Sequence, residues 1–191
     1  MYPSLLTDAS LYVTLEMIDV DLAATARAQG CGCGGVLHSG NYRRKPRGGP
    51  VGLGAGYDLR FSFCCACDGC RSRTTPASVR FLGRKVYLGA VVVVATMLRH
   101  GVTRWRAKRL RELLGVSEKT LRRWCIFWQQ TFAQSAFWKQ ARASLAQPVE
   151  ASELPGGLLE RFTGDAAKRL EHLLLFLRPI TTEAGRIGRR K

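Results

Sequence analysis

The sequence predicts an α+β protein in which a small β-hairpin region precedes a mainly α-helical region. Two short strand-like segments, VLHSGNYRRKP and YDLRFSF, lie between two groups of cysteines in the first half of the chain. In the second half, apolar residues recur at helical spacing on both sides of Gly115. With 191 residues, of which 46% are hydrophobic, the chain is long enough for one domain or two small ones and apolar enough for a core.

Shifts in composition divide the chain into four predicted segments. They are a helical segment at 1–30, a β region with a Gly-rich loop at 31–85, a helical domain at 86–147, and amphipathic helices with a basic tail at 148–191. Within the first segment, residues 10–29 predict one or two short helices, with Asp21 near a helix start and Gly30 as a stop.

The charge of the chain is concentrated in its middle. The formal net charge is +16, and residues 31–147 carry +17 because the two ends nearly cancel. A surplus of this size excludes an ordinary neutral enzyme and predicts a polyanionic partner. The longest apolar run, at 88–98, has 11 residues, whereas a membrane-spanning helix needs about 20. Because the first residues also lack the basic start of a signal peptide, we expect a cytoplasmic protein with no membrane partner.

Six of the seven cysteines lie in two groups whose spacing is typical of a metal site. The first group is Cys31 and Cys33, and the second is Cys64, Cys65, Cys67 and Cys70. In a reducing cytoplasm, clustered cysteines are metal ligands more often than disulfides. Two thiolate pairs separated by a hairpin match a structural zinc site, and the arrangement resembles a zinc ribbon. A closed set of four thiolates leaves no position for water, so the expected role of the zinc is folding.

The sequence leaves the ligand set open. Cys67 and Cys70 have the usual two-residue spacing, while Cys65 with Cys70 is a workable alternative pair. His38 can also replace one thiolate, and the alternative without a metal is a group of buried free cysteines.

Residues 104–130 have the spacing of a helix-turn-helix. With Gly115 as the turn glycine, all five expected apolar positions are filled, by Leu110, Leu114, Val116, Leu121 and Cys125. Ser117 then caps a recognition helix that begins at about Glu118. Arg111 stands where a small residue usually lets the two helices approach closely. The alternative interpretation is a helical hairpin with solvated basic faces.

The basic residues of the middle segments are predicted to contact duplex DNA. Those near or on the recognition helix, which can enter a major groove, are Ser117, Lys119, Thr120, Arg122 and Arg123. Those upstream, which would contact the backbone, are Arg104, Arg106, Lys108 and Arg109. The loop beside Tyr42 adds Arg43, Arg44, Lys45 and Arg47. This loop also motivates an alternative function, an RNA-binding or ribosome-associated zinc-ribbon protein.

The remaining apolar residues predict how the helices pack. Helices at about 86–99, 104–114 and 118–132 are expected to form one unit, with Trp105, Trp124 and Trp128 in the core. Near the C-terminus, an apolar stripe is formed by Leu170, Leu173, Leu174 and Leu177. This stripe either packs onto the helical domain or pairs with a second copy to form a homodimer.

The segment GVSEKTLRRW resembles the recognition helices of insertion-sequence transposases and resolvases. The order of motifs over residues 31–132 resembles the zinc-ribbon transposases or their small accessory DNA-binding proteins. The resemblance implies docking on the ends of a mobile element and a zinc ion held by Cys31, Cys33, Cys70 and either Cys67 or Cys65. Such transposases cut DNA with carboxylates that hold Mg²⁺ on a nuclease domain, and the acidic residues after the recognition helix show no strand pattern to carry such a site. We therefore expect a nucleoid-associated DNA-binding protein that is not an enzyme, or the DNA-binding fragment of a split transposase.

Overall fold

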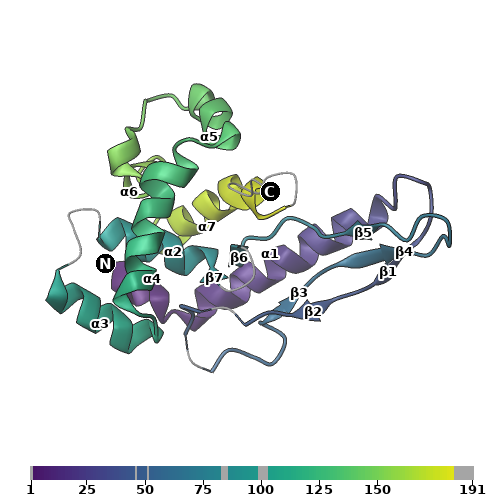
Figure 1. The fold of residues 1–191 in the computed structure, drawn as a ribbon, viewed down its shortest axis with the longest axis horizontal. Helices are drawn as coiled ribbons and strands as arrows, with labels where there is room; N and C mark the ends of the chain where they lie inside the picture. Colours follow the sequence, from purple (N-terminus) through teal and green to yellow (C-terminus); the bar gives the residue numbers. More distant parts are fainter. Residues whose placement is uncertain (1, 46, 51, 83–85, 99–102, 183–191) are drawn as a thin grey trace.

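A helical body and a long arm make up the protein (Figure 1). The computed structural model describes residues 2–45, 47–50, 52–82, 86–98 and 103–182. The body contains most of the helices, and the arm consists of the first long helix with the β-strands that run beside it (Figure 1). This architecture confirms the predicted α+β class.

The elements follow one another with short connections. The α-helices are α1 (Ala9–Ala28), α2 (Leu88–Met97), α3 (Arg104–Leu114), α4 (Glu118–Ile126), α5 (Ala136–Ala141), α6 (Gly156–Leu159) and α7 (Ala166–Leu177). The strands are β1 (Leu37–Ser39), β2 (Tyr42–Arg43), β3 (Leu59–Arg60), β4 (Phe63–Cys65), β5 (Arg73–Thr74), β6 (Phe81–Leu82) and β7 (Val86–Tyr87). Short 3-10 helices are η1 (Tyr2–Leu6), η3 (Arg142–Ser144), η4 (Ala151–Glu153) and η5 (Arg178–Thr181), and η2 (Phe127–Phe132) is a π-helix that continues α4.

The N-terminal segment forms one helix, α1, which joins the body to the arm. Asp8 caps it, because its carboxylate accepts the amides of Ser10 and Leu11, and Gly30 ends it with a φ of 71°. Asp21 lies inside this helix, so the prediction that it stands near a helix start is wrong. At 1.5 Å per residue, its 20 residues extend about 30 Å.

The strands of the arm form one antiparallel hairpin with a single register. Leu37 pairs with Cys65 in β1–β4, and Arg43 pairs with Leu59 in β2–β3. Between these two pairs both strands advance by six residues in opposite directions, so β1–β4 and β2–β3 follow one register. The amide of Gly40 donates to the carbonyl of Ser62 at 2.8 Å between the two paired stretches. β5 extends this hairpin at the edge of β4.

A buried ion pair fastens the hairpin to α1 and to β6. Asp19 and Arg80 are each only 1% exposed, and Arg80 Nε donates to the Asp19 carboxylate at 2.7 Å. Arg80 also donates to the carbonyls of Tyr57 and Leu59, and Asp19 accepts the amide of Val79. Arg80 Nη1 also lies 3.6 Å from the Glu16 carboxylate. Loss of Arg80 would leave the Asp19 carboxylate buried without its cation.

The apolar run that precedes α3 is the centre of the body. Every residue from Leu88 to Thr96 of α2 is buried, and α2 packs against η1, α4, α6 and α7. A helix that is apolar all round is expected in such a position. In the part of the chain that the structure describes, no helix is both long enough and apolar enough to cross a bilayer.

The C-terminal leucine stripe is buried within the chain. Its residues, all at most 2% exposed, are Leu170, Leu173, Leu174 and Leu177. They belong to the main hydrophobic cluster, which runs from Leu5 to Ile180 and includes α2. Of the two predicted alternatives, packing onto the helical domain is therefore observed. The basic tail at 186–191 lies outside the described residues.

Candidate metal centre and candidate nucleic-acid interface

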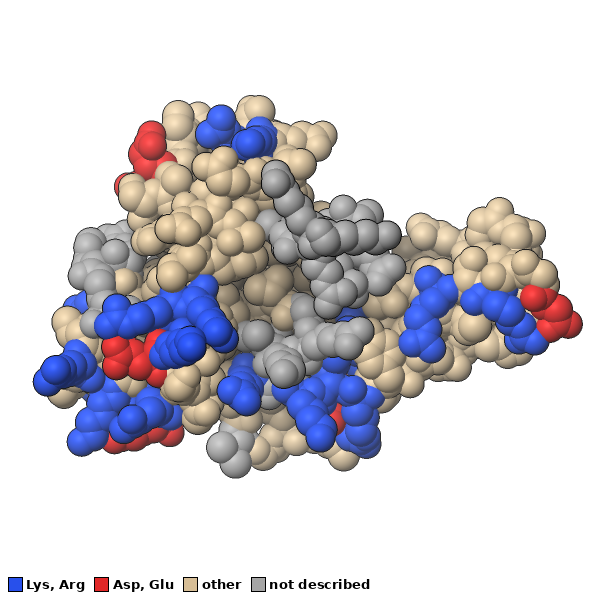
Figure 2. Space-filling view, in the orientation of Figure 1, with Lys and Arg blue, Asp and Glu red and all other residues tan. Residues whose placement is uncertain are grey.

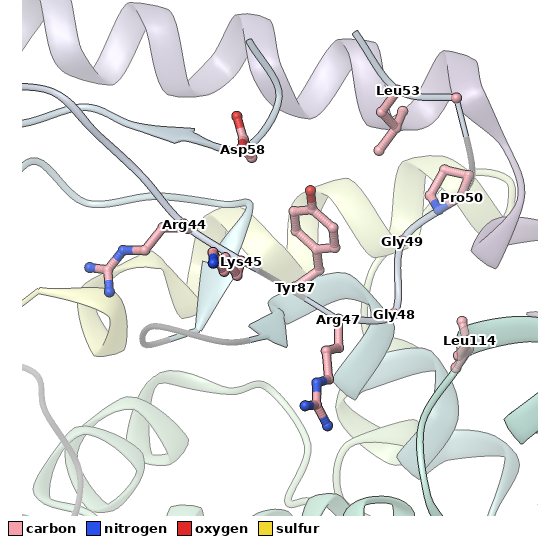
Figure 3. Close-up of a pocket in the computed structure, with 11 residues that line it drawn as sticks. Arg44, Lys45, Arg47, Gly48, Gly49, Pro50, Leu53, Asp58, Tyr87 and Leu114 are labelled. Atoms are coloured by element: carbon pink, nitrogen blue, oxygen red, sulfur yellow. The ribbon is translucent and has the colours of Figure 1, made fainter. Parts of the chain in front are cut away.

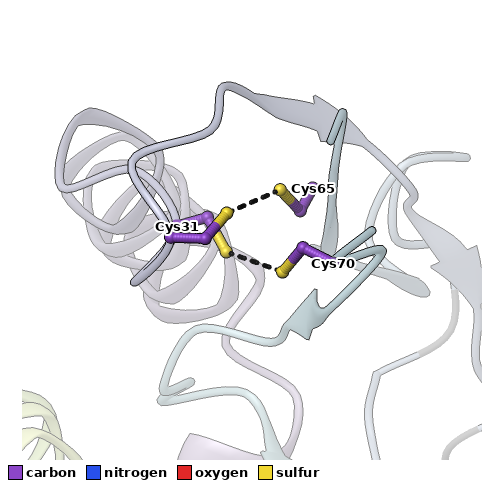
Figure 4. Close-up of side chains that lie close together, drawn as sticks. Cys31, Cys65 and Cys70 are labelled. Carbon is purple, nitrogen blue, oxygen red and sulfur yellow. Dashed lines mark hydrogen bonds between the residues drawn. The ribbon is translucent and has the colours of Figure 1, made fainter. Parts of the chain in front are cut away.

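Four cysteines meet at the end of the arm that is distant from the body (Figures 1 and 4). Cys31 and Cys33 follow α1, Cys65 ends β4, and Cys70 lies in the turn before β5. Their sulfur atoms all lie within 4.8 Å of one another. The Sγ atoms of Cys31 and Cys70 are 3.6 Å apart, and those of Cys33 and Cys65 are 3.4 Å apart.

These separations fit one tetrahedral metal ion. Metal–sulfur bonds of about 2.3 Å place the sulfurs of a tetrahedral site about 3.8 Å from one another. The two closest sulfur pairs are already near this value, so small rotations of the side chains are enough to coordinate an ion. All four positions would then be filled by protein, which is the arrangement of a structural site.

Each of the four thiols is influenced by the backbone amide of the residue two places later. The amide of Cys67 donates to the sulfur of Cys65 at 3.4 Å. The amides of Cys33, Gly35 and Ser72 act in the same sense, because they lower the pKa of Cys31, Cys33 and Cys70 respectively. The net pKa is nevertheless raised at Cys31, by the thiols of Cys33 and Cys70, and at Cys65, by burial and the thiol of Cys33. The net pKa is lowered at Cys33 and Cys70, which favours the thiolate there.

Cys70 has the most favourable environment for a thiolate. The hydroxyl of Ser72, 3.1 Å from Cys70 Sγ, and then the amide of Ser72 lower the pKa of Cys70 to about 6. The thiolate is the form that binds metals. The loop geometry therefore prepares this residue for coordination.

One of the predicted ligand sets corresponds to the group of four close sulfurs. Cys65 joins the group, whereas Cys67 contributes its amide and lies outside the group. His38 is exposed on β1 and is also outside it. A Cβ at Gly35 would lie 2.5 Å from Cys67 Sγ and 2.7 Å from Cys65 Sγ, so only glycine fits between these sulfurs. Strand alternation is the signal that could have selected Cys65, because it shares the buried face of β4 with Phe63.

α3 and α4 form a pair of helices joined by a short turn. Gly115 ends α3 in the left-handed region with a φ of 62°, and the Ser117 hydroxyl accepts the amide of Thr120 at the start of α4. Of the five predicted apolar positions, four are buried and Cys125 is partly buried. Arg111 is exposed, so its side chain is not buried between the two helices.

The basic side chains of this helix pair face solvent. The exposed ones are Arg104, Arg106, Lys108, Arg109, Arg111, Lys119, Arg122 and Arg123, together with Ser117, while Thr120 is half-buried. Figure 2 shows Lys and Arg gathered over α3 and α4 and again beside the hairpin loop. Arg122 pairs with Glu118 at 2.6 Å. Such an exposed pair is worth at most about 1 kcal/mol, so the guanidinium remains available to a ligand.

Trp105 is exposed, whereas the sequence predicted that it lies in the core. It is 66% exposed, with the guanidinium of Arg109 5.5 Å from its ring, whereas Trp124 and Trp128 are buried as predicted. The reason is its place on the helix, because Trp105 lies on the face opposite Ala107 and Leu110, which point into the core. A helical projection of α3 would have shown this.

The basic loop of the hairpin lies against the helix pair. A Cβ at Gly48 would lie 2.9 Å from the Cβ of Ala90 on α2 and 3.2 Å from the ring of Trp124 on α4. A pocket of about 500 Å³ opens between the loop and the end of α3, at Leu114 (Figure 3). Its basic lining residues are Arg44, Lys45 and Arg47. Arg43 is exposed nearby and pairs with Asp58. The loop cations and the helix pair therefore form neighbouring parts of one surface.

Comparisons of this chain with models of protein families, with curated proteins and with solved structures find no match.

Proposed function

We propose that this protein binds duplex DNA through α3 and α4, which act as a helix-turn-helix with α4 as the recognition helix. The observation that carries the proposal is the Gly115 turn, which presents an exposed basic helix directly beside the basic hairpin loop. A duplex is the partner whose charge complements both parts.

Two kinds of contact are proposed. Lys119, Arg122 and Arg123 on α4 enter the major groove, where arginine can bind guanine O6 and N7 together. The cations of α3 and of the loop bind phosphates and fix the orientation of the protein. Trp105 stands among the cations of α3, where its exposed ring can pack against the sugar–phosphate backbone.

The proposed metal is zinc, and its proposed role is to hold the end of the arm. Four thiolates in a closed tetrahedral set are a common structural zinc site. Because no position remains for water, the ion would contribute to folding and would not activate a substrate. A targeting or regulatory role of mobile-element type, without a catalytic step of its own, is the function that the resemblance of GVSEKTLRRW favours.

The test is a series of mobility-shift measurements over a range of salt concentrations. Affinity for duplex DNA is expected to fall steeply with salt, with a slope of about −0.9 for each phosphate contacted. A site selected from random duplexes should lose its preference when Arg122 and Arg123 are both replaced by alanine, at a cost of about 1–3 kcal/mol for each base contact.

Lys139→Ala on α5 is the matched control, because Lys139 is exposed and lies on a different part of the body. It should preserve the sequence preference. Affinity that barely changes with salt would contradict the proposal. Structured RNA that displaces duplex DNA in competition would contradict it as well and would favour the RNA-binding alternative.

A further inference from the structure

One face of the arm carries two guanidinium groups close to the ring of Tyr42. Arg44 lies 4.7 Å from the centre of the Tyr42 ring and donates from Nη2 to the Tyr42 hydroxyl at 2.6 Å. Arg73, which belongs to β5, lies 5.7 Å from the same ring. Two arginines that are far apart in the sequence are thus held around a single aromatic side chain.

The register of the hairpin explains why these residues meet. Side chains opposite each other in an antiparallel pair lie on the same face of the sheet. Gly40 and Tyr42 therefore share a face with Ser62 and with the Cys64–Arg73 pair beside it. A Cβ at Gly40 would lie 3.7 Å from Arg73 Nη2, so the guanidinium of Arg73 crosses the hairpin over a residue that has no side chain.

The positive charge of this cluster is not neutralised within the described part of the chain. Neighbouring arginines have acidic partners, because Arg43 pairs with Asp58 and Arg71 with Asp68. Among the described residues, Arg44 and Arg73 form no ion pair with a carboxylate.

The buried Arg60 adds positive charge on the same face of the hairpin. Arg60 is 2% exposed and lies opposite Tyr42 in the ladder. Burial lowers the pKa of Arg60, and the charge of Arg44 lowers it further, although Asp19 and Tyr42 act in the opposite direction. The cluster is therefore a region where a negatively charged group would be stabilised.

We infer that Tyr42, Arg44 and Arg73 form a phosphate-binding site, and that this site holds a backbone phosphate of the duplex that α3 and α4 bind. The inference rests on the proposed function. Arg44 also lines the pocket beside α3, so the basic surface continues from the helix pair through the loop to this face of the arm. Guanidinium groups suit phosphate oxygens, and the contact with Tyr42 fixes Arg44 before binding.

The site makes the arm a second point of attachment. The paired stretch of the hairpin, residues 37–44, extends about 26 Å at 3.3 Å per residue. In a duplex held at both α4 and Tyr42, the protein would protect the backbone from hydroxyl-radical cleavage over a longer segment than the helix pair covers. The contact would be independent of sequence, because phosphates carry no base information.

The test compares Arg73→Gln with Lys139→Gln, which removes the same charge from α5, on duplexes that contain the selected site. Arg73→Gln should make the salt slope shallower by about 0.9. The ratio of wild-type to variant affinity should then fall about threefold between 50 and 200 mM salt. Hydroxyl-radical footprinting should show protection lost on one side of the site, with the base preference unchanged.

Gly40→Val tests the geometry without a change of charge, because the new side chain would displace the guanidinium of Arg73. Its matched control is Ser39→Val, at the neighbouring position on the other face of the hairpin. Gly40→Val should reproduce the shallower slope and the shorter footprint, and Ser39→Val should not. Thermal unfolding of both variants establishes that the arm is folded.

The outcomes separate this inference from the proposed function. A wild-type slope and footprint for Arg73→Gln, with site preference lost on replacement of Arg122 and Arg123, would overturn the phosphate site and leave the helix-turn-helix intact. The absence of duplex binding by the wild-type protein would overturn both. Shortened protection in Arg73→Gln and Gly40→Val, together with unchanged base preference, would support both.

Discussion

At the scale of single residues, the cysteine group shows how two neighbouring thiols acquire different roles. Cys65 points to the buried face of β4 and joins the other three sulfurs, whereas Cys67 is exposed and provides the amide that donates to Cys65. Cys67 therefore contacts the group through its backbone amide, and its sulfur is not one of the four.

This difference predicts opposite results for two serine substitutions. Cys65→Ser should remove one of four ligands and weaken zinc binding strongly, because a hydroxyl is a poor ligand for zinc compared with a thiolate. Cys67→Ser should retain one zinc ion per chain, because the amide that donates to Cys65 is unchanged. Native mass spectrometry measures the stoichiometry directly. Loss of zinc in Cys67→Ser with retention in Cys65→Ser would contradict the prediction and show that Cys67 is the ligand in place of Cys65.

At the scale of elements, the turn between α3 and α4 depends on a backbone conformation that favours glycine. Gly115 has a φ of 62°, and a Cβ there would have no atom within 4 Å. Gly115→Ala should therefore reduce the free energy of unfolding by about 1 kcal/mol through backbone strain alone. Gly54 has equal space for a Cβ and no positive φ, so Gly54→Ala is the matched control and should be nearly neutral. Denaturant titration of the two variants measures the difference, and equal stabilities would contradict it.

Local signals explain which elements could be predicted from the sequence. Gly115 and Ser117 predict the end of α3 and the start of α4, because a turn glycine and a helix cap affect only the residues next to them. The observed helices have these bounds. The contact of the Gly48 loop with α2 and α4, and the pair of Asp19 with Arg80, join residues about 40 to 75 positions apart. No periodicity or spacing reports such distant contacts, because they depend on how complete elements pack. The choice between Cys65 and Cys67 is a different case, because the alternation of buried residues along β4 is a local signal that favours Cys65.

At the scale of the whole molecule, two hydrophobic clusters of very different size share α1. The main cluster fills the body, and the second contains only Ala23, Leu37, Phe63 and Cys65 as buried residues. The hairpin is fastened to α1 and β6 near its loop, where Arg80 binds the carbonyls of Tyr57 and Leu59. Its other end has only the small cluster and the cysteine group.

This division predicts that removal of the metal loosens the end of the arm and leaves the body folded. So few buried apolar residues cannot offset the conformational entropy of an ordered hairpin end without a further link. After chelation, hydrogen exchange should accelerate in β1, β4 and β5 and remain slow in α2, which the main cluster surrounds. The Cys65→Ser variant should show this exchange pattern before chelation and change little afterwards. If chelation instead unfolds α2 together with the hairpin in one cooperative step, the two clusters form a single folding unit, because α1 then transmits the loss from one cluster to the other.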